Sequence, residues 1–318
     1  MSEALHLEGP LDVPVALVIF NRADVTRQVF ARIREVRPKR LFVIGDGPRF
    51  PAEQARCDAA RAEIRVDWPC EVGMLYADAN LGCKTRPASG IDWVFSQVDE
   101  AIVLEDDCLP AVSFFGFCRN LLRRYRDDER VMCIGGTSLY PGEPSREDAS
   151  YYFARYGATW GWATWKRAWG YYDVNLRDWP SVKKSSGLDD VFATREERWF
   201  WTDLFDRQHD GEISGWDYQW LYARLLRSGL TAAPTQNLVT NLGFRPDATH
   251  TARVPKVFDP SRSHGELVEI HHPRHVVPSR AVDEYYFHEI FNPHGLRGIA
   301  ASRARRLVEA LASARRSR

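Results

Sequence analysis

Three acidic residues, Glu105, Asp106 and Asp107, follow directly after the apolar run at residues 102–104. The apolar run predicts a short buried strand, so the carboxylates stand where this strand ends. Adjacent carboxylates at such a place repel one another and lose hydration unless a positive group lies beside them. A divalent cation such as Mn²⁺ or Mg²⁺ is the simplest partner, because these ions prefer oxygen ligands. An ordinary acidic turn after a strand is the alternative on these residues alone.

Polar residues also stand at the ends of three other predicted strands. The apolar runs are residues 15–20, 41–44 and 72–77, and the polar residues that follow them are Asn21 and Arg22, then Asp46, then Asn80. Strands that alternate with helices through short loops predict a parallel sheet with helices on both faces. Ligands bind such sheets beyond the carboxyl ends of the strands. We therefore expect these polar residues and the three acids to share one crevice.

An aromatic region supplies a second set of candidates. The chain has 11 Trp residues, and many of them fall between Trp160 and Trp220. Trp160 and Trp162 could pack in a core, or they could form a floor for a sugar ring, whose apolar C–H face suits aromatic rings. Asp217 is the only acid beside Trp216, and its surroundings disfavour the charged carboxylate, which suits a general base. A helix N-cap is the common alternative for such an aspartate.

A polar loop near residue 245 carries groups that could grip a phosphate. It contains Arg245, Thr249 and His250, whose side chains donate hydrogen bonds to anions. A single histidine is more often structural than functional, so this signal is weak alone.

Composition limits the class of protein. A chain of 318 residues can form one large α/β domain or two small ones. Its 43 basic and 43 acidic residues balance, which gives no case for nucleic-acid binding. Six cysteines without a Cys-x-x-Cys pair indicate reduced thiols in a cytosolic protein. The N-terminus lacks the features of a signal peptide, and the longest apolar run, residues 13–20, is too short to span a membrane.

The chain resembles GT-A-fold glycosyltransferases, close to the family-2-like bacterial enzymes and more distantly similar to eukaryotic N-acetylglucosaminyltransferase I, over about residues 13–251. The likeness rests on Leu104-Glu105-Asp106-Asp107, followed by Leu109-Pro110 and Phe114-Phe115, where such enzymes carry an Asp-x-Asp motif. It implies an α/β fold with a central, mostly parallel mixed sheet flanked by helices. The expected divisions are a flexible leader (1–12), a nucleotide-sugar-binding half (13–136), an acceptor-binding half (137–295) and a basic tail (296–318).

The resemblance also implies roles for individual residues. Asp107 would ligate Mn²⁺ or Mg²⁺, with Glu105 and Asp106 near the ribose and the sugar. Asp217 stands where the relatives keep a catalytic base, although Tyr218 replaces the second acid of their Trp-Asp-Asp-Trp motif. The other implied site residues form two groups. Donor-binding residues are Asn21, Arg22, Asp46, Asn80, Arg245, Thr249 and His250, and sugar- or acceptor-binding residues are Trp160, Trp162 and Trp216.

The function implied by the resemblance is metal-dependent, inverting transfer of a sugar from a nucleoside-diphosphate donor, with a UDP-sugar favoured, to a hydroxyl of a carbohydrate or glycolipid. Such chemistry belongs to surface polysaccharide or glycoconjugate synthesis in the bacterial cytoplasm, at the inner face of the membrane if the basic tail binds anionic lipid. A frayed, solvated tail is the alternative. Two rival functions remain, a catalytically degenerate carbohydrate-binding or adaptor protein and a sugar-1-phosphate nucleotidyltransferase. The second lacks its Gly-rich, Lys-bearing loop here, because Asn21-Arg22-Ala23-Asp24 follows the first strand.

Overall fold

One eight-stranded sheet runs through the protein, in the order β4-β3-β2-β5-β9-β7-β10-β8. The computed structural model describes residues 2–5, 7–142, 148–185, 187–244, 265–295 and 298. The strands are β2 (Val15–Ile19), β3 (Arg40–Gly45), β4 (Glu71–Tyr76), β5 (Glu100–Glu105), β7 (Val131–Gly135), β8 (Tyr151–Ala154), β9 (Trp162–Trp165) and β10 (Leu230–Pro234). The pairs among β4, β3, β2 and β5 are parallel, as is β7 with β10. Strands β9 and β8 run antiparallel to their neighbours.

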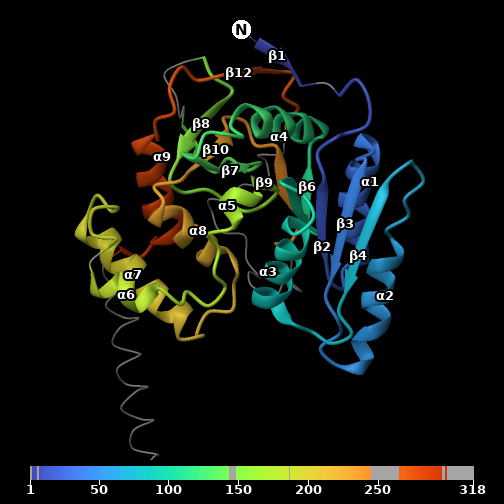
Figure 1. Cartoon of the computed structure of the whole chain (residues 1–318), viewed down its shortest axis with the longest axis horizontal. Helices are drawn as coiled ribbons and strands as arrows, with labels where there is room; N and C mark the ends of the chain where they lie inside the picture. Colours follow the sequence, from blue (N-terminus) through green and yellow to red (C-terminus); the bar gives the residue numbers. More distant parts are fainter. Residues whose placement is uncertain are drawn as a thin grey trace, which may run out of the picture.

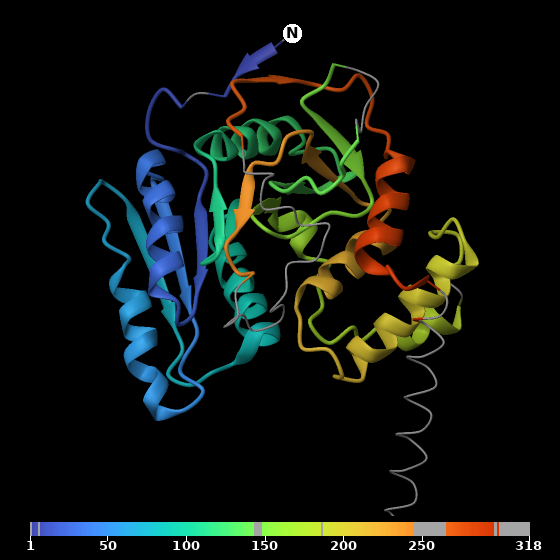
Figure 2. The same ribbon diagram turned by 180° about the vertical axis from the view of Figure 1, so that it is seen from behind.

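Helices cover both faces of this sheet, as Figures 1 and 2 show from opposite sides. The helices are α1 (Ala23–Val36), α2 (Gln54–Ala62), α3 (Gly82–Phe95), α4 (Val112–Arg124), α5 (Lys166–Trp169), α6 (Trp179–Lys184), α7 (Arg195–His209), α8 (Asp217–Leu226) and α9 (Arg280–Tyr285), with a 3₁₀ turn at Pro51–Glu53 and a π turn at Tyr286–Phe291. The expected α/β class, with a mostly parallel mixed sheet between helices, is confirmed.

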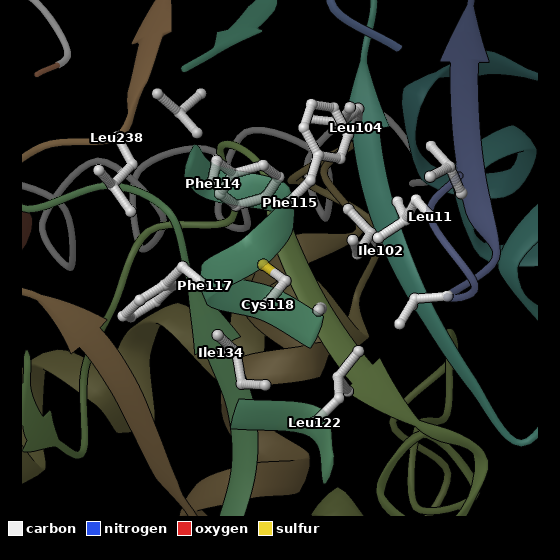
Figure 3. Packing of buried hydrophobic residues seen from close by; sticks show 14 of the residues in the cluster. Leu11, Ile102, Leu104, Phe114, Phe115, Phe117, Cys118, Leu122, Ile134 and Leu238 are labelled. Carbon is white, nitrogen blue, oxygen red and sulfur yellow. The ribbon is translucent and has the colours of Figure 1, made fainter. Parts of the chain in front are cut away.

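Side-chain alternation explains the two layers of core. Leu17 and Ile19 of β2 pack in one cluster with the apolar faces of α1 and α4, part of which Figure 3 shows around Phe114 and Phe117. Ala16 points to the other face, where α3 and the aromatic residues of α8 form a second cluster. Successive residues of a strand face opposite sides, so a strand buried on both faces reads as a continuous apolar run. This is why the sequence pattern identified β2, β3 and β5.

The later part of the chain builds the far end of the molecule. Helices α6 to α9 gather there, away from α1 and α2 (Figure 1). Apolar side chains of these helices and of the π turn that follows α9, among them Trp201, Phe205 and Tyr286, form a third cluster with β8. Strands β8, β9 and β10 nevertheless complete the same sheet as β2 to β5, so the two expected halves share one sheet.

The N-terminal segment differs from the flexible leader expected over residues 1–12. Strand β1 (Ser2–Ala4) pairs antiparallel with β12 (Glu269–His271), at the edge where Figure 2 shows the two strands side by side. Leu5 and Leu11 are buried in the main core. The expectation was wrong for these residues because a few leucines in a polar segment give too short a pattern to indicate a strand, and the partner strand lies more than 260 residues away in the sequence.

Two further observations bear on the class of protein. All six cysteines are free thiols. Within the described ranges, no helix has the length and apolar character needed to cross a bilayer.

Candidate active site

The three acids lie at the carboxyl end of β5, and Arg22 faces them from the N-cap of α1. Arg22 Nε lies 3.3 Å from Asp106 Oδ2, and its Nη2 also donates to Asp106 Oδ1. The same Nη2 lies 2.9 Å from Asp107 Oδ2. Strands β2 and β5 are adjacent and parallel, with Val18 opposite Glu105. The loops that follow them therefore meet, and the guanidinium reaches both carboxylates.

Burial and mutual repulsion set the protonation of these acids. Burial raises the pKa of Glu105 to about 8, and Asp107, Asp106 and Asp217 add to the rise, while a hydrogen bond from Trp216 opposes it. Burial also raises the pKa of Asp106 to about 6, although Arg22 draws it down. Burial lowers the pKa of Arg22, but Asp106 and Asp107 outweigh that effect and the net pKa is raised. Burial and repulsion thus favour the neutral forms of Glu105 and Asp106, while Arg22 pairs with Asp106 and Asp107.

The positive partner of the acids is therefore an arginine, where the sequence indicated a divalent cation. No group of three or more His, Cys, Asp or Glu side chains in the described part of the chain could cage a metal ion. Mg²⁺ and related ions often bind through one or two carboxylates and complete their shell with water and substrate phosphates. Asp107, whose side chain keeps 13% of its surface exposed, suits that mode of binding. Asp106, only 4% exposed and bonded through both oxygens to Arg22, does not.

Asp217 comes to the same acids from a different element, helix α8. It is the first residue of α8, and the N-cap is Trp216, so the N-cap interpretation of Asp217 is wrong. Trp216 Nε1 donates to Glu105 Oε1 at 3.3 Å, and Asp217 is close enough to raise the pKa of Glu105. A carboxylate in the first turn of a helix interacts favourably with the helix dipole. The predicted base and the predicted metal ligand thus belong to one charged cluster.

The tryptophans divide between core and surface. Trp162 is fully buried, and its ring stacks on Trp216 with centroids 5.5 Å apart. Trp216 is itself buried, at 5% exposure. Neither ring face is open to a ligand in this structure, so the packing alternative holds for both and the sugar-floor interpretation is corrected. Trp160 is partly exposed and meets Phe244 edge to face at 5.4 Å, so sugar binding by its ring stays a prediction.

The stacked tryptophans serve the site indirectly. Trp169 and Trp220 join Trp162 and Trp216 in one aromatic cluster. Tyr172 stacks on Trp169, with centroids 4.1 Å apart, and its hydroxyl donates to the carbonyl of Trp216. A rigid aromatic cluster of this kind fixes the position of the residue that follows Trp216, which is Asp217.

Asp46 and Asn80 are brought together one strand further along the sheet edge. Asp46 Oδ1 accepts from the backbone N–H groups of Gly47 and Leu81, and Oδ2 accepts from Gly82 N and from Asn80 Nδ2. The carboxylate therefore holds the turn that opens α3, a structural task that the sequence did not indicate. Asn21 donates to Glu53 at 2.7 Å. Asp46 N also donates to Ile19 O, which ties this group to the end of β2.

Arg86 belongs to the same region and was missed from the sequence. It lies on α3, is 5% exposed, and its Nε and Nη2 have no hydrogen-bond partner among the described residues. Burial lowers its pKa, and Asp46 is close enough to oppose that effect. Buried polar groups without partners are rare and costly. Spacing in the sequence could have indicated that Arg86 is buried, because Arg86, Gly90 and Val94 lie four residues apart on the buried face of α3.

Asp107 has one more close neighbour, the end of β11 (Val239–Asn241), which pairs with β6 (Cys108–Pro110). Leu242 N donates to Asp107 O at 2.7 Å. A Cβ on Gly243 would collide with Asp107 Oδ2. The next residue but one is Arg245, and Arg245, Thr249 and His250 lie outside the described residues.

Two surface clefts lie apart from this cluster. One, of about 520 Å³, is lined by residues such as Tyr171, Tyr222 and Arg227, and the other, of about 670 Å³, by residues such as Arg34 and Trp68. Neither is lined by a residue that the sequence predicted for the site. The structure thus brings Arg22 into contact with Asp106 and Asp107, and Asn80 into contact with Asp46. Asp217 is linked to this group through its electrostatic effect on Glu105 and through the hydrogen bond of its neighbour Trp216.

Two solved structures align with this chain at low sequence identity. No protein-family model and no curated protein matches the sequence. The mannosyltransferase PcManGT from Pyrobaculum calidifontis, solved in complex with GDP-Man and Mn²⁺, aligns over 69% of this chain and 73% of its own, with 11% identity and a TM-score of 0.39. HddC from Yersinia pseudotuberculosis aligns over 49% of this chain and 77% of its own, with 10% identity and a TM-score of 0.30. At this level of similarity, the function has to be argued from the residues of the chain itself.

Proposed function

We propose that the protein is a metal-dependent, inverting glycosyltransferase that moves a hexosyl or N-acetylhexosaminyl group from a nucleoside-diphosphate donor, with a UDP-sugar favoured, to a hydroxyl of a carbohydrate or glycolipid. The observation that carries the proposal is the charged group formed by Asp107, Arg22 and Asp217 at the carboxyl end of the parallel strands. Ligands of open α/β sheets bind at that edge. The motif resemblance of Glu105-Asp106-Asp107 supports the same function, with the cytoplasm as the compartment.

The donor would bind across the ends of β2, β3 and β5. Arg22 and the partnerless donors of Arg86 supply positive charge for the diphosphate. Asp46 and Asn80 shape the turn beside the nucleoside, and Asn21 holds the neighbouring segment through Glu53. Asp107 would hold Mn²⁺ or Mg²⁺. When bound, the ion would neutralise the diphosphate and stabilise it as a leaving group.

Asp217 would act on the acceptor. Its carboxylate takes the proton of the acceptor hydroxyl as that oxygen bonds to the anomeric carbon, and the bond from that carbon to the diphosphate oxygen breaks. Attack from the face opposite the leaving group inverts the configuration. Trp160 offers a partly exposed ring for a sugar. Positioning and charge neutralisation account for most of the acceleration in such a reaction.

A binding protein with a degenerate site is the second candidate. The ion pairs of Arg22 with Asp106 and Asp107 favour it, because acids that are already paired need no cation. Release of the nucleoside diphosphate from a donor distinguishes the two functions, since a binding protein releases none.

A thermal-shift screen tests the proposed function directly. Nucleoside diphosphates and their sugars are added with and without Mn²⁺, and we expect a rise in melting temperature only where nucleotide and metal are both present. Ligands that stabilise the protein are then incubated as donors to measure release of the diphosphate. No stabilisation by any nucleotide with Mn²⁺ or Mg²⁺ would exclude the transferase.

A further inference from the structure

Arg22 pairs with Asp106 and Asp107, so it would compete with a metal ion for Asp107. Arg22 Nη2 lies 2.9 Å from Asp107 Oδ2, and the same nitrogen donates to Asp106. The other oxygen of Asp107 lies 3.5 Å from the thiol of Cys108. Arg22 thus occupies one oxygen of the carboxylate that would hold a cation, and the other oxygen faces the buried thiol of Cys108.

Charge makes the two occupants mutually exclusive. Asp106 and Asp107 carry at most two negative charges, and Arg22 already supplies one positive charge at close range. A divalent cation on Asp107 would repel the guanidinium strongly in this half-buried setting, where charges are poorly screened. Arg22 must therefore turn away from Asp107 before the cation can bind well.

The diphosphate offers the guanidinium a new partner. Arginine binds phosphate with the same two-pronged geometry that it uses for a carboxylate. Arg22 begins α1, where the first N–H groups of the helix also favour an anion. Transfer of the guanidinium from carboxylate to phosphate keeps it paired and frees Asp107 at the moment when the diphosphate brings its own oxygen ligands.

We propose that Arg22 is an exchangeable counter-ion that blocks the cation site of Asp107 until a nucleoside diphosphate takes the guanidinium away, so that cation and diphosphate bind cooperatively. This inference rests on the proposed function. The cation alone then binds weakly, the diphosphate raises its affinity, and by thermodynamic linkage the cation raises the affinity for the diphosphate by the same factor. Arg22 is a positioning residue in this scheme because it controls when Asp107 becomes available.

The test compares Mn²⁺ binding by the wild-type protein, Arg22→Gln and Arg22→Lys, with Arg27→Gln as the matched control. Arg27 lies on the same helix and pairs with Glu63, away from the site. Free Mn²⁺ is measured by electron paramagnetic resonance, first without nucleotide and then with saturating UDP, at the same pH for all four proteins.

Without nucleotide, we expect Arg22→Gln to bind Mn²⁺ roughly 5- to 150-fold more tightly than the wild type, the usual range for coupled sites. Arg22→Lys, which keeps the charge but loses the planar fork, should show a smaller gain, and it serves if Arg22→Gln does not fold. UDP should raise the Mn²⁺ affinity of the wild type and of Arg27→Gln, and raise that of Arg22→Gln much less.

An unchanged Mn²⁺ affinity in both Arg22 variants overturns the exchange, even when the wild type binds UDP with Mn²⁺. An equal effect of UDP on wild type and Arg22→Gln overturns it too. Failure of the wild type to bind UDP in the presence of Mn²⁺ is a different result, because it rejects the proposed function itself.

Discussion

In the proposed reaction two carboxylates have separate tasks, and Asp217 is the one that would take a proton. Asp217 is the first residue of α8 and follows the buried Trp216. It is close enough to Glu105 at the end of β5 to raise the pKa of that acid, although it comes from a different segment. An acceptor hydroxyl between Asp217 and a donor held at Asp107 would meet the base on the side away from the diphosphate. The division of labour between the two aspartates can be tested by substitution.

We expect Asp217→Asn to keep donor binding and to lose roughly 10²- to 10⁴-fold in turnover, the range for removal of a general base. Initial rates of sugar transfer and calorimetric donor affinity are measured on the same preparations. Asp58→Asn, which changes an exposed carboxylate of α2, is the matched control and should retain full activity. Turnover of Asp217→Asn within a few-fold of wild type would reject Asp217 as the base.

Arg86 is the residue whose charge has least explanation in the described structure. Arg86→Met removes the partnerless donors, and we expect nucleotide affinity to fall about 10- to 100-fold, since hydrogen bonds to charged groups contribute about 1.5–3 kcal/mol. The melting temperature should stay equal or rise, because a buried charge is removed. Arg224→Met is the contrast, since Arg224 is bonded to Thr231 and to Arg155 O and should lose stability. Reduced stability of Arg86→Met with unchanged affinity would show that Arg86 is structural.

Residue patterns predicted the strand ends well and the partners of the acids poorly. The apolar run before Glu105 located β5, and parallel pairing explains why Arg22 and Asp106 meet. The sequence did not show that both carboxylate oxygens of Asp46 accept hydrogen bonds from the turn that precedes α3. Such contacts depend on the path of a loop in space, and a loop has no periodicity to read.

At the scale of the elements, α8 and the strand pair β6–β11 bring the two sides of the site together. The spacing of apolar residues in α1 and α4 marks the buried faces of these helices, which pack in the main core. It could not assign the tryptophans, because a ring on a strand looks the same in the sequence whether it is buried or open. The stack of Trp162 on Trp216 decides this, and it forms between β9 and the N-terminus of α8.

The end of β11 should control Asp107 sterically. In Gly243→Ala the new methyl group collides with Asp107 Oδ2, so either the carboxylate or the strand end must shift. We expect UDP affinity in the presence of Mn²⁺ to fall about tenfold or more, which corresponds to about 1.4 kcal/mol, while circular dichroism shows the wild-type fold. Gly9→Ala, where the added methyl group meets nothing within 4 Å, should bind normally. Normal binding by Gly243→Ala would mean that the described position of Asp107 is not the one that holds the ligand.

At the scale of the whole molecule, buried acids at the site make the free energy of unfolding depend on pH. Glu105 illustrates this, because burial and three neighbouring acids raise its pKa from 4.5 to about 8. A carboxyl group with a raised pKa binds its proton more tightly in the folded protein than in the unfolded chain. Its contribution to stability is therefore full below about pH 4.5 and is lost as the pH rises through 8.

We expect the free energy of unfolding of the metal-free protein, measured with urea in chelator-treated buffer, to fall between pH 5 and about pH 8.5. Asp106, with its pKa raised to about 6, acts in the same direction. Glu105→Gln keeps an oxygen for Trp216 and cannot ionise, so its stability should vary less with pH. The same pH dependence in wild type and Glu105→Gln would show that Glu105 ionises normally in the folded state.

The overall architecture was the easiest feature to predict and the chain ends the hardest. Strand–helix alternation is a local signal repeated along the chain, and it correctly predicted the parallel strands β4, β3, β2 and β5 between helices. The mixed character of the sheet was implied by the resemblance and not by the alternation. The pairing of β1 with β12 joins the first described residues to a segment more than 260 residues later and has no local signal. The expected basic tail at residues 296–318 falls almost wholly outside the described residues, so its contact with lipid stays a prediction.

Calorimetric titration of UDP into the wild-type protein and Asp107→Ala, each with and without Mn²⁺, measures directly whether donor binding needs both the metal and Asp107. Asp58→Ala controls for the loss of a carboxylate elsewhere. We predict saturable binding in the wild type and Asp58→Ala with Mn²⁺, and loss of that binding when Mn²⁺ is omitted or Asp107 is replaced. Equal binding of UDP by Asp107→Ala and wild type in the presence of Mn²⁺ would contradict the assignment of Asp107 and, with it, the glycosyltransferase proposal.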